Sequence, residues 1–309
     1  MTDFAFEILR HRPAVHELCV GAFLQERLRL ADGIWAVPLQ PLGFRAESEV
    51  TARYVLEVLD TPVDEQAFAS LSEQGATARP LVAIVHQSQV DASPEELEQV
   101  ALPKFAHARM LVSWSAGERA EPFAIVTARL DRCFFRMLPP RSRGRQRLGF
   151  GNEREPHEAQ LQRLYAAVSS DERFAFAVSM FRDALREEDA SFRVARFYAC
   201  LEALTYRIRR EHGIRSRAAV RDLLGIADGA TMTIDVGGRQ VAFDRVELVG
   251  RLRDKLFHGV PFDKEELTVD ARTAYEQLVA HPDQLRDVLQ SDCELEIARW
   301  ANGASRGQR

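Results

Sequence analysis

The sequence predicts an α+β domain over residues 1–138 and an all-α helical bundle with an inserted β-hairpin over residues 157–302. Three observations predict this order. The first half contains short runs that alternate apolar and polar residues between turn residues, as β-strands do. The second half repeats apolar residues at helical spacing. Between them, residues 139–156 lose apolar periodicity and gain arginine, glycine and proline.

The composition is that of an ordinary globular protein, with 46% hydrophobic and 28% charged residues in a chain of 309. Its net charge of −5 argues against a globally basic nucleic-acid binder, so any nucleic-acid contact must be a local patch. Only three of the 41 basic residues are lysines, which leaves arginine as the cation that dominates such patches.

Four separated cysteines without a CxxC pair predict reduced thiols rather than a zinc site or a disulfide framework. The N-terminus has no basic segment followed by a long apolar run, and no run of about eighteen apolar residues occurs. We therefore expect a cytoplasmic protein without a membrane contact.

The first domain is predicted to contain a hairpin in which strands 23–30 and 34–39 flank the turn Ala31-Asp32-Gly33. Ser93 followed by Pro94 predicts the start of a helix, because serine caps and proline occupies the first helical position. Further strands are expected at 50–59, 81–86, 109–115 and 122–130.

Residues 139–156 are the predicted domain boundary. Their alternating arginines and glycines fit a solvated linker, and a flexible phosphate-contacting segment is the alternative. Residues 303–309 are small and polar and are expected to form a disordered tail.

The helical domain shows one interruption, at Thr231–Phe243, where two alternating runs around Gly237-Gly238 predict a β-hairpin. The clearest apolar stripe joins Phe197, Leu201, Leu204 and Ile208. Helices are expected at 158–169, 171–188, 191–212, 216–224, 244–257, 264–280 and 283–300.

The helix at 244–257 concentrates the residues that can carry chemistry. Its apolar face is formed by Val249, Leu252 and Leu256, which leaves Arg253, Asp254 and Lys255 off that face and His258 at its end. Gly259 and Pro261 then stop the helix. The partial negative charge at a helix C-terminus favours a protonated histidine, which suits a general acid near neutral pH.

The segments Ser191–Leu204, with its Leu-Glu-Ala-Leu run, and Leu248–Gly259, with its Arg-Asp-x3-His run, resemble the HEPN superfamily, most closely its Apea-like branch. The resemblance covers residues 171–300 only. It implies a small helical bundle that acts as a homodimer and a metal-independent RNase without a cofactor. The family's arginine and histidine match Arg253 and His258, its polar follower matches Asp254, and the acid of the partner helix matches Glu202.

Elementary chemistry agrees with these roles. RNA is cleaved without metal when its 2′-hydroxyl attacks the adjacent phosphorus, a reaction that needs a group to move protons and a cation to stabilise the phosphorane. At about 100° per residue, positions 253 and 258 lie about 140° apart, so we expect Arg253 to reach a shared phosphate around the helix end or across a two-fold axis. Asp254 is four residues before His258 and is expected to orient it. Arg251 and Lys255 are the expected RNA contacts.

Several alternatives stay open at this point. Arg–His spacings of this kind also occur elsewhere in the chain, for example at Arg207 and His212. An inactive HEPN-like module for dimerisation, RNA binding or protein interaction is the alternative to catalysis, and Glu202 is either a reacting group or a buried acid that fixes Arg253. A third possibility is an active site in the first domain, around His86 or His107. The resemblance also implies a bacterial defence or toxin-like setting with an antitoxin or regulatory protein.

Overall fold

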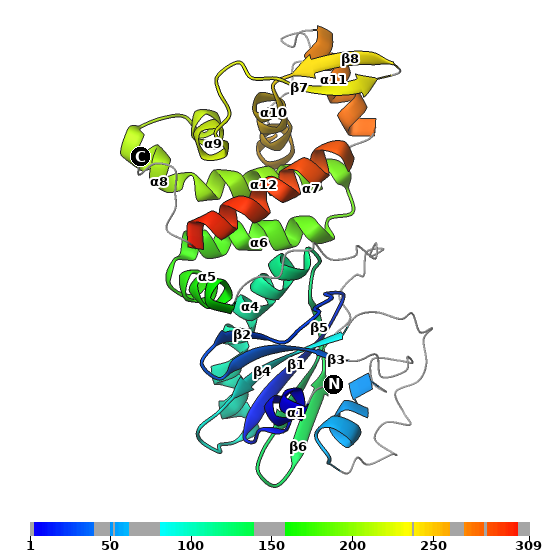
Figure 1. Ribbon diagram of the computed structural model, residues 1–309, viewed down its shortest axis with the longest axis vertical. Coiled ribbons are helices and arrows are strands. Elements are labelled where there is room, and N and C mark those ends of the chain that lie inside the picture. Colours follow the sequence, from blue (N-terminus) through cyan, green and yellow to red (C-terminus); the bar gives the residue numbers. More distant parts are fainter. Residues whose placement is uncertain are drawn as a thin grey trace. The chain divides into compact units, whose positions relative to one another are not determined.

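The computed structural model describes residues 3–39, 50–51, 53–61, 81–138, 158–236, 238–259, 269–280 and 283–301. Its described parts form a sheet-containing N-terminal unit and a helical C-terminal unit with a small two-stranded sheet (Figure 1). The two compact units are Met1–Ser169 and Ser170–Arg309. The predicted linker 139–156 and tail 303–309 lie outside the described residues and stay predictions.

An antiparallel six-stranded sheet organises the first unit, with strand order β2-β3-β4-β1-β5-β6. The central strand β1 pairs with β4 on one side and β5 on the other, and every residue of it is buried. The strands are β1 Ala14–Val20, β2 Leu28–Ala31, β3 Ile34–Leu39, β4 Leu81–Gln87, β5 Glu121–Ala128 and β6 Cys133–Met137.

Helical segments cover both faces of this sheet. Successive residues of a strand point to opposite faces; on β1, His16 contacts Tyr54 of η1 (Tyr54–Val58) while Glu17 pairs with Arg109 of α4 (Pro94–Ala116). The face toward η1 also receives α1 (Asp3–Arg10), whose Ile8 and Leu9 join the core. Helix α4, with Arg109, therefore lies over the opposite face of the sheet from η1.

Several predictions for the first unit are confirmed. Strands β2 and β3 form the expected hairpin around Asp32-Gly33, although β2 begins only at Leu28. Strands β4 and β5 lie where they were expected. Ser93 caps α4 through a complete capping box with Glu96, so the serine–proline signal identifies the helix start correctly.

Two strand predictions are wrong. Residues 109–115 belong to α4, and the described residues within 50–58 are helical, including the π-helical turn η1. Their buried residues explain the difference: Val50, Tyr54 and Val58 recur every four positions, which is a helical period. The sequence reading also missed α1, β1 and β6.

The second unit is built around α7 (Ala190–Leu204), which packs against α6, α10 and α12. The predicted helix 191–212 is divided at Thr205, the C-cap of α7 and the start of α8. Helix α5 (Glu158–Ser170) was predicted within the helical domain, and Glu158–Ser169 falls within the first compact unit. The other helices are α6 Glu172–Arg186, α8 Tyr206–His212, α9 Ser216–Leu224, α10 Arg245–His258, α11 Val269–Ala280 and α12 Asp283–Ala301.

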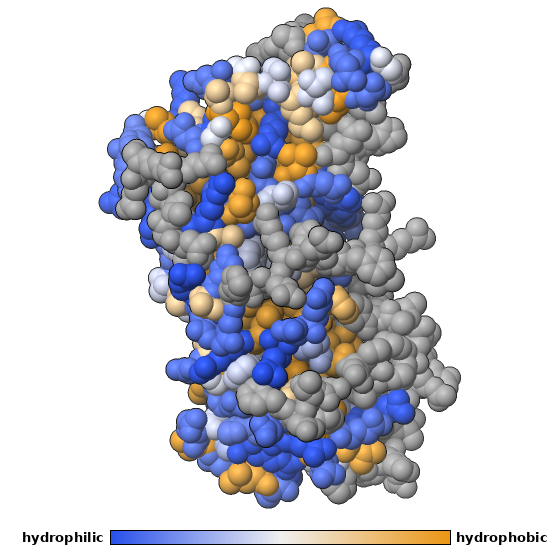
Figure 2. All heavy atoms as spheres, in the orientation of Figure 1, coloured by the Kyte–Doolittle hydropathy of each residue, from blue (hydrophilic) through white to orange (hydrophobic). Residues whose placement is uncertain are grey.

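The inserted hairpin is confirmed as β7 (Met232–Val236) and β8 (Arg239–Phe243), an antiparallel pair next to α11. The predicted start of α11 at residue 264 lies outside the described residues. Among the residues that the structure describes, no helix is both long enough and apolar enough to cross a bilayer. Figure 2 shows polar residues over much of the visible surface.

Candidate functional site

Helix α10 holds the candidate site at its C-terminal end. Asp244 caps its first turn by accepting from the backbone N–H groups of Val246 and Glu247. His258 is its last residue, and Gly259 follows in the left-handed conformation at φ 64°. The predicted helix end is therefore confirmed, and it leaves the imidazole exposed.

Arg253 and His258 meet around this helix end. Arg253 Nη1 lies 2.7 Å from His258 Nε2. A guanidinium only donates hydrogen bonds, so Nε2 is the acceptor and the ring proton of a neutral imidazole is on Nδ1. Two side chains whose positions lie about 140° apart on the helix thus converge because arginine is long and both lie in the last two turns.

Arg253 is held from the neighbouring helix α7. Glu202 Oε2 lies 2.7 Å from Arg253 Nη2, an ion pair rather than an aligned hydrogen bond. Only 12% of the Glu202 side chain is exposed. Ser216, at the start of α9, donates its hydroxyl to Glu202 Oε1, so the acid is fixed from two sides. This arrangement matches the expectation that Glu202 fixes Arg253.

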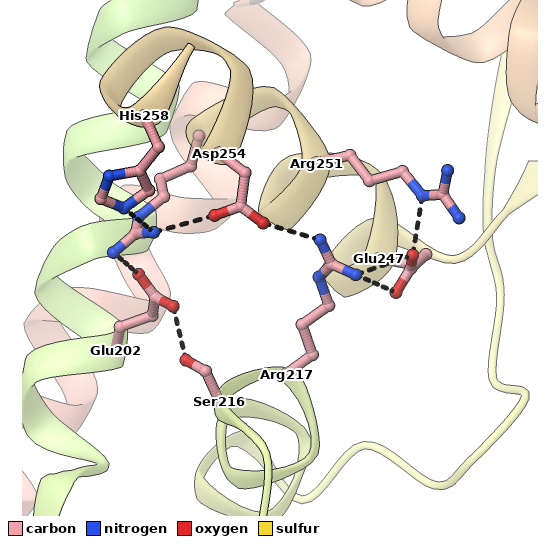
Figure 3. A network of polar contacts seen from close by, with 8 residues as sticks. Glu202, Ser216, Arg217, Glu247, Arg251, Asp254 and His258 are labelled. Carbon is pink, nitrogen blue, oxygen red and sulfur yellow. Dashed lines mark hydrogen bonds and ion pairs between the residues drawn. The ribbon is translucent and has the colours of Figure 1, made fainter. Parts of the chain in front are cut away.

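Asp254 continues the network to α9. Its Oδ1 accepts from Arg253 Nη1 at 2.8 Å, and its Oδ2 accepts from Arg217 Nη2 at 2.9 Å (Figure 3). Arg217 also donates to both oxygens of Glu247, at 3.0 and 3.3 Å, and Arg251 Nε donates to Glu247 at 2.8 Å. Acids and arginines therefore alternate along the network.

Gly250 makes room for this network. A Cβ atom at Gly250 would lie 2.7 Å from Arg217 Nε and 3.0 Å from the Tyr198 hydroxyl. No side chain larger than hydrogen fits there unless Arg217 moves. Tyr198 is buried, its hydroxyl has no hydrogen-bond partner among the described residues, and burial followed by the nearby Glu202 carboxylate raises its pKa.

The surroundings of His258 are open. Phe257 is 38% exposed and packs against Phe192 of α7 with ring centroids 6.2 Å apart. Lys255 is exposed on the same last turn, while Arg251 is engaged with Glu247. Lys255, Phe257 and His258 are therefore all exposed on the last turn of α10.

Four predicted residues come together: Arg253, His258, Asp254 and Glu202. One contact differs from the expectation, because Asp254 bonds Arg253 and Arg217 rather than His258. Four further members of the site, Ser216, Arg217, Glu247 and Gly250, were missed. Sequence offers little signal for Ser216 and Arg217, since their partners are 14 to 37 residues away.

The first unit contains a second histidine beside a cation. His86 Nε2 lies 2.7 Å from Lys104 Nζ of α4, and burial followed by the lysine charge lowers the pKa of His86 to about 4. His86 is only 6% exposed. His107 contacts Ser169 at 3.1 Å and the ring of Tyr165. The His86 ring is therefore largely covered from solvent.

Within the described ranges, no group of three or more histidine, cysteine, aspartate or glutamate side chains is placed to hold a metal ion. The four cysteines are free, and three of them are buried. The described polar groups around the end of α10 include an imidazole, an arginine and two carboxylates, those of His258, Arg253, Glu202 and Asp254.

No protein family matches this chain, and neither the curated proteins nor the solved structures include one that is significantly similar to it.

Proposed function

We propose that the protein is a metal-independent endoribonuclease of the HEPN type, which cleaves single-stranded RNA at Arg253 and His258. One observation carries the proposal: the exposed His258 imidazole lies 2.7 Å from Arg253 at a helix end, with Glu202 and Asp254 fixing the arginine. An imidazole can move the proton of a 2′-hydroxyl, and a guanidinium can stabilise the charge on the phosphorane. The products are a 2′,3′-cyclic phosphate and a free 5′-hydroxyl.

The proposal includes a homodimer in the cytoplasm. In one chain, Arg253 Nη1 already serves Asp254 and His258, and Nη2 faces Glu202. Few of its five N–H donors remain for a phosphate. A second copy that faces the first across a two-fold axis would supply another set of the same groups. Arg251 and Lys255 would then contact the flanking phosphates.

The test is cleavage of a single-stranded RNA in the presence of chelator. Arg253→Ala and His258→Ala should each lower the cleavage rate by about a hundredfold or more, the usual contribution of a positioned proton-transfer group. His107→Ala is the matched control, since it removes a partly exposed histidine of the other compact unit and should leave the rate unchanged. Wild-type protein that cleaves no RNA, or variants that cleave equally well, would contradict the proposal.

Mixing the two inactive variants tests the dimer. If each site takes Arg253 from one copy and His258 from the other, a heterodimer of Arg253→Ala and His258→Ala contains one intact site. Mixed protein should then regain about a quarter of the wild-type rate. No recovery would place each working Arg–His pair within a single chain, as the 2.7 Å contact favours.

A second candidate function is a non-catalytic interaction module, with an antitoxin or regulatory protein as partner. The saturation of the network favours it, because Arg253 faces two carboxylates and Asp254 faces two arginines. Such alternation is also what a purely structural ion-pair cluster requires. This reading predicts that Arg253→Ala weakens assembly or partner binding while no RNA is cleaved by any variant.

A further inference from the structure

We propose that Arg209, Arg210 and Arg215 form a binding track for the phosphate backbone of single-stranded nucleic acid, next to the Arg253–His258 site. This inference rests on the proposed function for the identity of the strand as RNA. The three residues, called here the arginine track, lie on α8 and on the connection from α8 to α9. They are distinct from Arg251 and Lys255, the contacts expected on α10.

The arginine track is a local excess of positive charge in an acidic protein. The net charge of the chain is −5, yet residues 207–217 contain five arginines and a single acid, Glu211. All three track residues are exposed. A patch of this kind attracts polyanions even when the whole protein repels them.

The track arginines also differ from other exposed arginines in their partners. Arg132, Arg136 and Arg239 are exposed and are each paired with an acid, Asp131, Glu98 and Asp270 respectively. Among the residues that the structure describes, no side chain pairs with Arg209, Arg210 or Arg215. Their guanidinium groups thus keep all their donors for an external anion.

A structural role explains only part of the track. Cations in the last turn of a helix stabilise its C-terminus, and Arg209 and Arg210 occupy that turn of α8. Arg215 lies beyond the helix end at Gly213, where this effect no longer acts. It is the N-cap residue of α9 and makes no capping hydrogen bond, and a positive charge does not stabilise this end of a helix.

The arginine track adjoins the candidate site in the sequence. Arg215 directly precedes Ser216, whose hydroxyl bonds Glu202, and Glu202 pairs with Arg253. A strand whose reacting phosphate lies at Arg253 and His258 can therefore place neighbouring phosphates on the connection that carries Arg215. Phosphate contacts of this type position a strand and carry no sequence preference.

The experiment measures binding of the full-length protein to a fluorescent single-stranded RNA of about 20 nucleotides, methylated at every 2′-hydroxyl so that it cannot be cleaved. A triple variant, Arg209→Gln, Arg210→Gln and Arg215→Gln, should bind about tenfold to a hundredfold more weakly at about 0.1 M salt. The dependence of log affinity on log salt should flatten by about 2, since each lost contact to a single strand removes about 0.7.

Two comparisons keep the result interpretable. The matched control replaces Arg132, Arg136 and Arg239 by glutamine, which removes the same charge from exposed but paired positions and should leave the affinity unchanged. The conservative variant with lysine at 209, 210 and 215 should retain most of the affinity and the salt slope, because phosphate contact needs charge more than shape.

The outcomes separate this inference from the proposed function. If the wild-type protein binds the methylated RNA but cleaves no unmodified RNA, the RNase proposal is contradicted and the proposal of a phosphate-binding arginine track still stands. Equal affinity and equal salt slope in the wild type and the glutamine variant would overturn the track. So would wild-type protein that binds neither this RNA nor the corresponding DNA, or that binds only an acidic protein through these arginines.

Discussion

The two units each contain a histidine whose Nε2 lies 2.7 Å from a cationic side chain, and the environments of these pairs are opposite. His86 and Lys104 lie between the sheet and α4, where burial lowers the pKa of both groups. His258 and Arg253 lie at an open helix end. The same kind of contact is thus buried in one unit, whereas in the other it involves an exposed imidazole. Access, rather than the pair itself, distinguishes a candidate active site.

The acids that pair with arginines differ between the two units in the same way, buried in the first and more exposed in the second. Glu17 is 1% exposed and pairs with Arg109 beneath α4, whereas the Glu202 side chain is 12% exposed and holds an arginine that borders solvent. A buried charge that loses its partner is strongly destabilising, while a partly exposed one is rehydrated at lower cost. Acids of the first unit should therefore govern stability, and acids of the α10 network should govern activity.

The largest expected effect is on the first unit. Glu17→Gln should lower the free energy of unfolding by about 3 kcal/mol, because Arg109 keeps its charge without a buried acid. Urea unfolding followed by the fluorescence of Trp35 and Trp114, with Trp300 replaced by phenylalanine, reports on this unit alone. A double variant that replaces Glu17 and Arg109 by leucine should recover much of the loss. An unchanged unfolding curve for Glu17→Gln would contradict the expectation that the buried acids of the first unit govern its stability.

Glu202→Gln should act mainly on cleavage. Glutamine keeps an oxygen for Ser216 but loses the charge that holds Arg253, so we expect RNA cleavage to fall by about tenfold to a hundredfold. Its effect on unfolding should be smaller than that of Glu17→Gln. Glu187→Gln is the control, since it breaks the Glu187–Arg196 ion pair in the same unit and should leave cleavage unchanged. Equal cleavage rates for Glu202→Gln and Glu187→Gln would show that the charge of Glu202 does not contribute to cleavage.

Gly250→Ala should destabilise the second unit by about 1 to 2 kcal/mol, because the new methyl group overlaps Arg217 and Tyr198. The gain in helix propensity offsets part of this cost. Adding Arg217→Ala should relieve most of the overlap, so a double-mutant cycle on unfolding should show coupling of about 1 kcal/mol. Additive effects would mean that Arg217 does not pass over Gly250 in solution.

The smallest effect comes from pH. Burial lowers the pKa of His16 to about 3 and of His86 to about 4, below the ordinary value of 6.5. As the pH falls below 6.5, these histidines bind protons in the unfolded chain but not in the folded chain. The free energy of unfolding is therefore highest above pH 6.5 and decreases toward pH 4. At about pH 5.8 each histidine should lower the free energy of unfolding by about 1 kcal/mol. His86→Gln should reduce this pH dependence of urea unfolding by about half.

Local signals predicted local structure well. Ser93-Pro94 identified the start of α4, Asp32-Gly33 identified a hairpin turn, and Asp244 and Gly259 bracket α10 close to where they were expected. Each of these features depends on residues within a few positions of one another. They therefore appear in the sequence before any tertiary contact is known.

The predictions of secondary structure were wrong where tertiary burial, rather than the local sequence pattern, decides the structure. Within residues 109–115, Met110–Val112 is a short apolar run of the kind found both in strands and in buried helices. The helical period is visible only over the whole of α4. Strand β1 was missed because His16 and Glu17 interrupt its apolar residues, although both are buried. At the site, the Arg253–His258 spacing was visible, whereas Arg217 joins it through contacts 30 and 37 residues away.

The position of Ser216 between α7 and α10 in the chain has a consequence for the order of folding. Glu202 and Ser216 are 14 residues apart, so they can bond as soon as α9 folds back on α7, before residue 253 has been synthesised. Helix α10 arrives only after the β7–β8 hairpin. Its docking brings a guanidinium to an acid that is already oriented. The polar network of a newly made chain thus stays incomplete until α10 has packed against α7.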